Sequence, residues 1–250
     1  MSEYVKTVLD ESVLRLTLAR PAKKNALTQD MYAALAAGLR RAEESAEVRA
    51  VLIAAEGDAF TAGNDLYDFA AMNTGAMSRR EAHSLTFLGA LAEAQKPIVA
   101  AVQGRAVGVG VTLLLHCDLV FVAEDAKLST PFVNLGLTPE AGSSWLLPAR
   151  IGHARAYAMF ALGEVVDGKT AASIGLANLA LPGGELQARA LAAARELAQR
   201  PIEALGATKR LMRDAAAIKA VMQREVEVFN QRLRSAEAAQ AFAAFAARKS

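Results

Sequence analysis

Residues 60–66 (FTAGNDL) and 104–113 (GRAVGVGVTL) have a composition suited to chemistry at an oxygen atom. Each segment places glycine where a predicted strand gives way to a loop or a helix. Glycine there permits a positive φ angle and lets the backbone come close to a ligand. Two free backbone N–H groups directed at one point stabilise a negative charge that develops on oxygen. The two segments therefore predict an oxyanion site whose donors are main-chain amides.

The same two segments resemble the oxyanion-hole halves of the crotonase family, also called the enoyl-CoA hydratase/isomerase superfamily. The resemblance extends from Val5 to about Lys249. It implies that the N–H groups of Asn64 and Val109 hold the thioester carbonyl oxygen of an acyl-CoA as it becomes an enolate. The Val109 donor is expected in the first turn of a helix, where unpaired N–H groups and the helix dipole favour an anion.

The resemblance also implies a set of residues around the substrate. Residues 20–27 match the family's loop around the adenine and phosphates of CoA, and the two lysines in it are either solvated or supply one phosphate contact. For Asp65 we favour the capping of a short helix over a role as a second acid. The substrate-binding residues expected from the resemblance are Ala22, Lys24, Ala62, Gly63, Asp65, Leu66, Gly108, Thr112 and Phe132.

Two positions argue against hydration. Hydratases of the family hold and activate a water molecule with two glutamates, and the matching residues here are Thr112 and Phe132. The threonine hydroxyl cannot act as a base near pH 7, and the phenylalanine side chain has no proton chemistry. The addition of water to a 2-enoyl thioester therefore lacks its usual machinery.

A carboxylate remains eight residues after Phe132, at Glu140. Here the chain resembles the peroxisomal-type Δ3,Δ2-enoyl-CoA isomerases in three motifs, which are TAGNDL, AVGVGVTLL and TPFVNLGLTPEAGSS. The resemblance implies that Glu140 is the single catalytic base, taking a proton from C2 of a 3-enoyl-CoA and returning it to C4. Without the resemblance, Glu140 is better interpreted as a surface residue in the first turn of a helix after Pro139.

Composition excludes several other classes of protein. The 250 residues are 53% apolar, and 28 basic against 26 acidic residues give a net charge of +2, with no basic block that would indicate nucleic-acid binding. The single cysteine, Cys117, excludes an intrachain disulfide and a cysteine-based metal site. The start of the chain lacks a secretory pattern, and the most apolar run, residues 106–115, is too short to span a bilayer. We expect a cytoplasmic protein with no membrane partner.

The pattern of elements predicts an α/β fold. Strands are expected at residues 5–10, 13–18, 50–55, 98–102 and 119–123, with helices at 28–45 and 78–94 and an almost entirely helical chain from residue 153 onward. Alternating strands and helices imply parallel pairing. The resemblance implies a ββα superhelix core, residues 1–195, which holds the CoA and oxyanion site. It also implies a C-terminal helical region, residues 196–250, which builds a homotrimer or a hexamer formed as a dimer of trimers.

Three functions stay open at this stage. The first is the isomerisation of 3-enoyl-CoA to 2-trans-enoyl-CoA in fatty-acid β-oxidation. The second is another crotonase-fold acyl-CoA reaction, including weak hydration, and the third is a catalytically silent acyl-CoA binder. No metal or redox cofactor is expected, and CoA is part of the substrate. The three histidines have no ligand spacing, and residues 116–118 (HCD) are interpreted as ordinary core or helix-end residues rather than a nucleophilic cluster.

Overall fold

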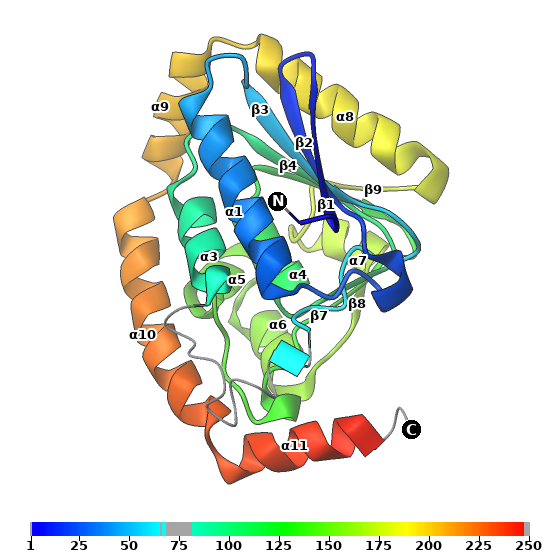
Figure 1. Cartoon of the computed structure of the whole chain (residues 1–250), viewed down its shortest axis with the longest axis vertical. Coiled ribbons are helices and arrows are strands. Elements are labelled where there is room, and N and C mark those ends of the chain that lie inside the picture. Colours follow the sequence, from blue (N-terminus) through cyan, green and yellow to red (C-terminus); the bar gives the residue numbers. More distant parts are fainter. Residues whose placement is uncertain (1, 66, 69–81, 248–250) are drawn as a thin grey trace.

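A six-stranded sheet forms the centre of the computed structural model, which describes residues 2–65, 67–68 and 82–247. The strand order is β1-β2-β3-β4-β6-β9. Strands β1 and β2 form an antiparallel hairpin, and each later strand pairs in parallel with its neighbour. Figure 1 shows this sheet in the upper part of the molecule. The strands are β1 (Val5–Asp10), β2 (Val13–Leu18), β3 (Ala50–Ala55), β4 (Ile98–Val102), β6 (Leu119–Ala123) and β9 (Leu179–Leu181).

The first five of these strands occupy the ranges that the sequence predicts. Every residue of β3 and β4 is buried, as expected for apolar runs at the centre of a parallel sheet. The expectation of an almost entirely helical chain after residue 153 was wrong in two places, because β8 (Val166–Asp167) and β9 are strands. Strand β8 completes a small second sheet with β5 (Arg105–Val107) and β7 (Lys127–Ser129). Runs of two or three residues are too short to show a period of two in the sequence.

Helices surround the sheet and form the lower part of the molecule. Helix α1 (Gln29–Glu44) is capped by the Thr28 hydroxyl, which accepts the Met31 N–H at 3.4 Å. It packs against α3 (His83–Glu93), and α8 (Gly183–Gln199) lies along β2, β3, β4 and β6. The expected helix at 78–94 is confirmed from residue 83 onward; residues 78–81 lie outside the described part.

The C-terminal helices form an arm along one side and the bottom of the molecule (Figure 1). They are α9 (Ile202–Met212), α10 (Ala215–Leu233) and α11 (Ala236–Ala247). Helix α10 contacts α3 and α5 (Ser143–Ile151), and α11 contacts η4 (Val133–Leu135). No helix within the described residues is both long and apolar enough to cross a membrane. The other helical segments are η1 (Pro21–Lys23), α4 (Val109–Thr112), η3 (Leu113–His116), α6 (His153–Tyr157), the π-helical η5 (Ala158–Leu162) and α7 (Gly168–Ser173).

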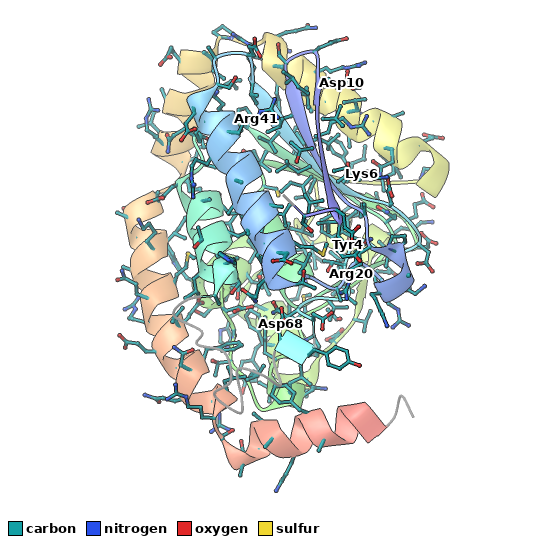
Figure 2. All side chains as sticks on the ribbon, in the orientation of Figure 1. Tyr4, Lys6, Asp10, Arg20, Arg41 and Asp68 are labelled. Carbon is teal, nitrogen blue, oxygen red and sulfur yellow. The ribbon has the colours of Figure 1, made fainter. Side chains whose placement is uncertain are left out.

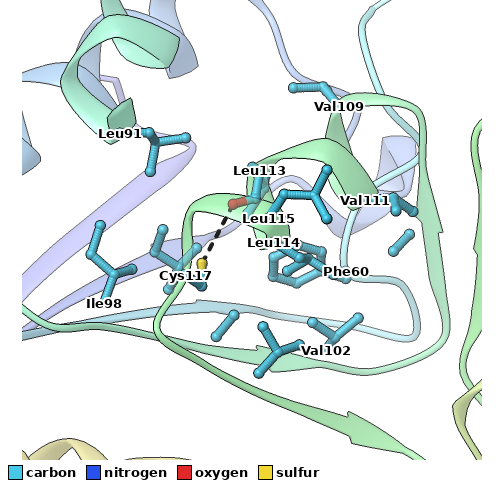
Figure 3. Packing of buried hydrophobic residues seen from close by; sticks show 14 of the residues in the cluster. Phe60, Leu91, Ile98, Val102, Val109, Val111, Leu113, Leu114, Leu115 and Cys117 are labelled. Carbon is cyan, nitrogen blue, oxygen red and sulfur yellow. Dashed lines mark hydrogen bonds between the residues drawn. The ribbon is translucent and has the colours of Figure 1, made fainter. Parts of the chain in front are cut away.

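The segment α4–η3 is anchored in the hydrophobic core, as Figure 3 shows. Leu113, Leu114 and Leu115 are almost fully buried, close to Phe60. The Cys117 thiol that follows donates a hydrogen bond to the Leu113 carbonyl at 3.6 Å, and burial raises the pKa of this thiol to about 12. The thiol is therefore protonated and is a packing residue, in agreement with the sequence interpretation.

Candidate active site

The two glycine-containing segments run side by side in the structure. Thr61 and Ala106 form a parallel bridge in which the Thr61 N–H donates to the Arg105 carbonyl and the Val107 N–H donates to the Thr61 carbonyl, both at 3.0 Å. Gly63 has φ +92°, and a Cβ atom at this position would lie 3.0 Å from the Val107 carbonyl oxygen. The close parallel approach therefore depends on glycine and brings residues 64 and 109 to the same end of the paired segments.

The pairing around Asn64 leaves its own N–H group unused. The Leu27 N–H donates to the Gly63 carbonyl at 2.8 Å, and the Asp65 N–H donates to the Leu27 carbonyl at 2.9 Å. In this parallel bridge Leu27 makes both bonds, one to the residue before Asn64 and one to the residue after it, and Asn64 makes neither. The Asn64 N–H accordingly makes no hydrogen bond to any described residue.

Val109 supplies a second amide of the same kind. It is the first residue of α4, after Gly108 with φ +56° and ψ −114°. The Gly108 N–H donates to the Ser129 carbonyl at 2.9 Å, and the Val111 and Thr112 N–H groups turn back to the Gly108 carbonyl at 2.9 and 3.0 Å. Within the described residues, the Val109 N–H has no acceptor. Two unpaired amides at the same end of paired segments can bind one negatively charged oxygen.

The side chains next to the Asn64 amide are fixed by contacts within the protein. The Tyr32 hydroxyl donates to the Asn64 Oδ1 atom at 2.5 Å. Asp65 accepts from Arg20 at 2.6 Å and from the Tyr67 N–H at 3.0 Å. The same guanidinium lies over the ring of Tyr4, 5.6 Å from its centroid, and the two side chains are labelled in Figure 2. Asp65 is therefore a buried carboxylate held between the Arg20 guanidinium and the Tyr67 amide.

The loop at residues 20–27 is fastened to the first oxyanion segment by Asn25. This fully buried residue has φ +52°, and its side-chain amide donates to the carbonyls of Glu56 and Ala59, each at 2.8 Å. Its own carbonyl accepts from the Thr61 hydroxyl at 2.7 Å. Sequence reasoning missed Asn25, although asparagine tolerance of positive φ was the available signal.

Three of the expected substrate-binding residues lie on or beside this loop. Ala22 is exposed on η1, and the Lys24 carbonyl accepts the Ala62 N–H at 2.9 Å. The Lys24 ammonium pairs with the exposed Asp58 carboxylate at 2.5 Å and lowers the pKa of that carboxyl. Because both partners are exposed, this ion pair leaves the lysine accessible to a phosphate. Leu66, another expected contact, lies outside the described residues.

Thr112 and Phe132, the residues that the resemblance matches to the hydratase glutamates, are both buried. Thr112 is fully buried on α4, and its hydroxyl has no hydrogen-bond partner within the described part of the chain. Phe132 is 5% exposed and packs against Phe160 with ring centroids 6.0 Å apart. Strand β7, which leads to Phe132, pairs with β5, which leads to Gly108. Thr112 therefore lies within the second oxyanion segment, and Phe132 follows a strand paired with it.

Glu140 is buried, so its interpretation as a surface residue was wrong. It is 3% exposed and lies three residues before α5. The next two residues, Ala141 and Gly142, have left-handed φ angles of +66° and +72°. The Ala141 carbonyl is hydrogen-bonded to His116 at the end of η3, at 2.7 Å. This contact ties the Glu140 turn to the helical segment that begins at Val109.

The fold and the two unpaired amides, those of Asn64 and Val109, are the features of a crotonase-type acyl-CoA enzyme. Comparison with known proteins shows the same class. The sequence model of the enoyl-CoA hydratase/isomerase family matches residues 9–250. The chain belongs to this family.

Its relatives carry more than one activity in their names. The chain is 34% identical to a 1,2-epoxyphenylacetyl-CoA isomerase of Escherichia coli, covering 100% of this chain and 98% of the other. It is 31% identical to enoyl-CoA delta isomerase 2 of Rattus norvegicus, covering 99% of this chain and 64% of the other. A probable enoyl-CoA hydratase of Rhodobacter capsulatus is 36% identical, with coverage of 82% and 79%.

Solved structures show the same fold. The Pseudomonas aeruginosa protein OdaA has a TM-score of 0.92 and 46% identity, covering 98% of this chain and 99% of the other. An enoyl-CoA hydratase/isomerase from Pseudoalteromonas atlantica has a TM-score of 0.93 and 40% identity, covering 98% of both chains. These likenesses establish an α/β crotonase fold for the whole chain, as the sequence predicts.

Proposed function

We propose that this protein isomerises 3-enoyl-CoA to 2-trans-enoyl-CoA with Glu140 as its single acid–base residue. The observation that carries the proposal is the buried Glu140 carboxyl on a turn tied to the oxyanion segment, in a chain with Thr112 and Phe132 at the hydratase positions. The 31% identity to an enoyl-CoA delta isomerase supports it. Family resemblance further supports a cytoplasmic homotrimer or dimer of trimers that acts in β-oxidation of unsaturated acyl chains.

The reaction needs one base and one oxyanion site. The Glu140 carboxylate removes a proton from C2, and the electron pair of that C–H bond delocalises onto the thioester oxygen to give a dienolate. The N–H groups of Asn64 and Val109 stabilise this oxygen. The Glu140 carboxylic acid then delivers its proton to C4 while the C2–C3 double bond forms. Atoms balance without water, because the proton that leaves C2 returns at C4.

The expected contributions of these groups are large enough to be measured separately. A positioned general base accelerates proton transfer by roughly 10²–10⁴-fold. One oxyanion donor contributes about 10²–10³-fold. Both are required because the α-proton of a thioester is only weakly acidic.

Assays with 3-cis- and 3-trans-hexenoyl-CoA, followed by the absorbance of the 2-enoyl product, test the proposal. The Glu140→Gln variant should lose roughly 10²–10⁴-fold in kcat and still bind saturated hexanoyl-CoA. Glu203→Gln on the exposed first turn of α9 is the matched control and should keep full activity. Full activity in Glu140→Gln, or faster hydration of crotonyl-CoA than isomerisation of the hexenoyl esters, would contradict it.

A further inference from the structure

The turn that carries Glu140 is held from one side by a buried carboxylate on α10. Glu225 is 7% exposed and accepts two backbone N–H groups, from Gly142 at 2.5 Å and from Ser144 at 2.8 Å. These amides belong to the cap and the first turn of α5, where an anion is favoured. Burial raises the pKa of Glu225, while the bonds from Ser144 and Gly142 oppose this shift and the charge of Glu140 adds to it.

The other side of the turn is held by a buried histidine and arginine. The His116 Nε2 atom lies 2.7 Å from the Ala141 carbonyl oxygen. Arg213 donates to the His116 carbonyl at 2.9 Å, and its second terminal nitrogen contacts the Nδ1 atom of the ring. Because a guanidinium can only donate, Nδ1 must accept, and Nε2 must therefore carry the proton that is donated to Ala141.

The protonation state of His116 agrees with this assignment. Burial, with a smaller contribution from the charge of Arg213, lowers the pKa of His116 to about 3. The ring is therefore neutral near pH 7 and has one fixed tautomer. A neutral ring with the proton on Nε2 can accept from Arg213 and donate to Ala141 at the same time, whereas a protonated ring would turn an N–H group towards the guanidinium.

The backbone at this turn requires such support. Ala141 has φ +66° although it carries a Cβ atom, and this left-handed conformation brings Cβ close to the following carbonyl oxygen. Strained conformations persist only where the surrounding structure determines them. His116 fixes the carbonyl of Ala141, and Glu225 fixes the amide of the next residue, Gly142.

We propose that His116, Arg213 and Glu225 are positioning residues that act as a clamp on the Glu140 turn. The clamp fixes the carboxyl of Glu140 relative to the oxyanion amides. Two of its three residues, Arg213 and Glu225, belong to the C-terminal part of the chain, so the position of this carboxyl depends on how that part packs. The inference rests on the proposed catalytic role of Glu140. A misplacement of about 1 Å in a catalytic group can cost on the order of 10²-fold in rate, so the loss of one anchor should be visible in kcat.

A pair of substitutions at His116 tests the hydrogen bond to Ala141. In His116→Gln, the amide nitrogen can take the place of Nε2 and donate to the same carbonyl. His116→Leu has a similar volume and no donor. We expect kcat to fall by on the order of 10²-fold in His116→Leu, with KM nearly unchanged, and to recover most of its value in His116→Gln.

A second pair on α10 tests the other anchor. Glu225→Gln keeps the shape of the side chain, but its NH2 group would face one of the two backbone N–H donors and cannot accept a hydrogen bond from it. Glu227→Gln, two residues further on the exposed face of the same helix, is the matched control. The first variant should lose kcat with little change in KM or in the binding of hexanoyl-CoA, and the second should match the wild-type enzyme. Circular dichroism establishes that each variant is folded.

The outcomes separate this proposal from the proposed function. If Glu140→Gln is as active as the wild-type enzyme, the catalytic role of Glu140 fails. If Glu140→Gln is inactive but His116→Leu and Glu225→Gln keep full kcat, the clamp fails while the function stands. Equal losses in His116→Leu and His116→Gln would likewise overturn it. Should His116→Leu not fold, Arg213→Met, which removes both donors to His116, takes its place with the same expected loss of kcat.

Discussion

The oxyanion segments are joined to their neighbours by backbone pairing, whereas the Glu140 turn is joined to distant parts of the chain by side chains. Thr61 and Ala106 pair as in a parallel sheet, and Leu27 pairs in the same way with Asn64. The amides of Gly142 and Ser144 are instead bonded to a carboxylate on α10. Backbone pairing requires only that no Cβ atom intrudes, so the oxyanion half depends on glycine. The carboxylate half depends on the chemical identity of residues far away in the chain.

The largest effect that tests this comparison is expected from Gly63→Ala. The new Cβ atom would lie 3.0 Å from the Val107 carbonyl oxygen, at a φ of +92° that alanine disfavours. The adjacent Asn64 amide should move, with a loss of about 10²–10³-fold in kcat, or about 3–4 kcal/mol of transition-state stabilisation. Steady-state isomerase kinetics measure this.

Gly89→Ala is the control for that substitution. Gly89 lies within α3, and no atom lies within 4 Å of the added Cβ position. This variant should keep full activity, and the better helix propensity of alanine should stabilise it by roughly 1 kcal/mol. Gly63→Ala with nearly wild-type kcat would show that the oxyanion half tolerates displacement and would remove the contrast with the Glu140 turn.

The next effect concerns how the stability of the carboxylate half changes at acidic pH. The folded-state pKa of His116, about 3, lies below its ordinary value of 6.5. As the pH falls below about 6.5, the unfolded chain binds a proton that the folded protein excludes, so stability is present at neutral pH and is lost on acidification towards pH 3. Between pH 7 and pH 5 this group should cost about 2 kcal/mol of unfolding free energy.

Urea unfolding at both pH values measures this loss. The wild-type protein should lose about 2 kcal/mol more than His116→Gln, since glutamine does not titrate. The two proteins share all other ionisable groups, so the difference between their losses isolates the histidine. Equal losses would mean that the pKa of His116 is not lowered in the folded protein, and the neutral ring that accepts from Arg213 through Nδ1 would then have no basis.

The same contrast explains how much the sequence could predict. The strands at 5–10, 13–18, 50–55, 98–102 and 119–123, and the helix at 28–45, were predicted because each depends on local pattern or local hydrogen bonding. The glycine motifs indicated the oxyanion half for the same reason. The bond from Gly142 to Glu225 spans 83 residues, and the contact between His116 and Arg213 spans 97. Contacts between residues so far apart leave no local pattern in a single sequence, so neither pair could be predicted from it.

The smallest effect is expected from a side chain in the oxyanion half. The Thr61 hydroxyl donates to the Asn25 carbonyl at 2.7 Å and accepts the Gly63 N–H at 3.1 Å. Thr61→Val keeps the shape and leaves the Asn25 carbonyl and the Gly63 N–H without this partner, so unfolding free energy should fall by about 1–3 kcal/mol. Because the backbone bridge from Thr61 to Ala106 remains, kcat should stay close to the wild-type value. Urea unfolding and isomerase kinetics on the same preparation measure both quantities.

Thr61→Ser, which retains the hydroxyl, is the control for the lost hydrogen bonds. The comparison of the two halves rests on opposite responses to the loss of a buried polar group. In the oxyanion half, Thr61→Val should lower stability and spare kcat, whereas in the carboxylate half, His116→Leu should lower kcat. If Thr61→Val lowers kcat as strongly as His116→Leu does, side chains position both halves, and the backbone bridge between residues 61 and 106 is not sufficient to hold the Asn64 amide in place.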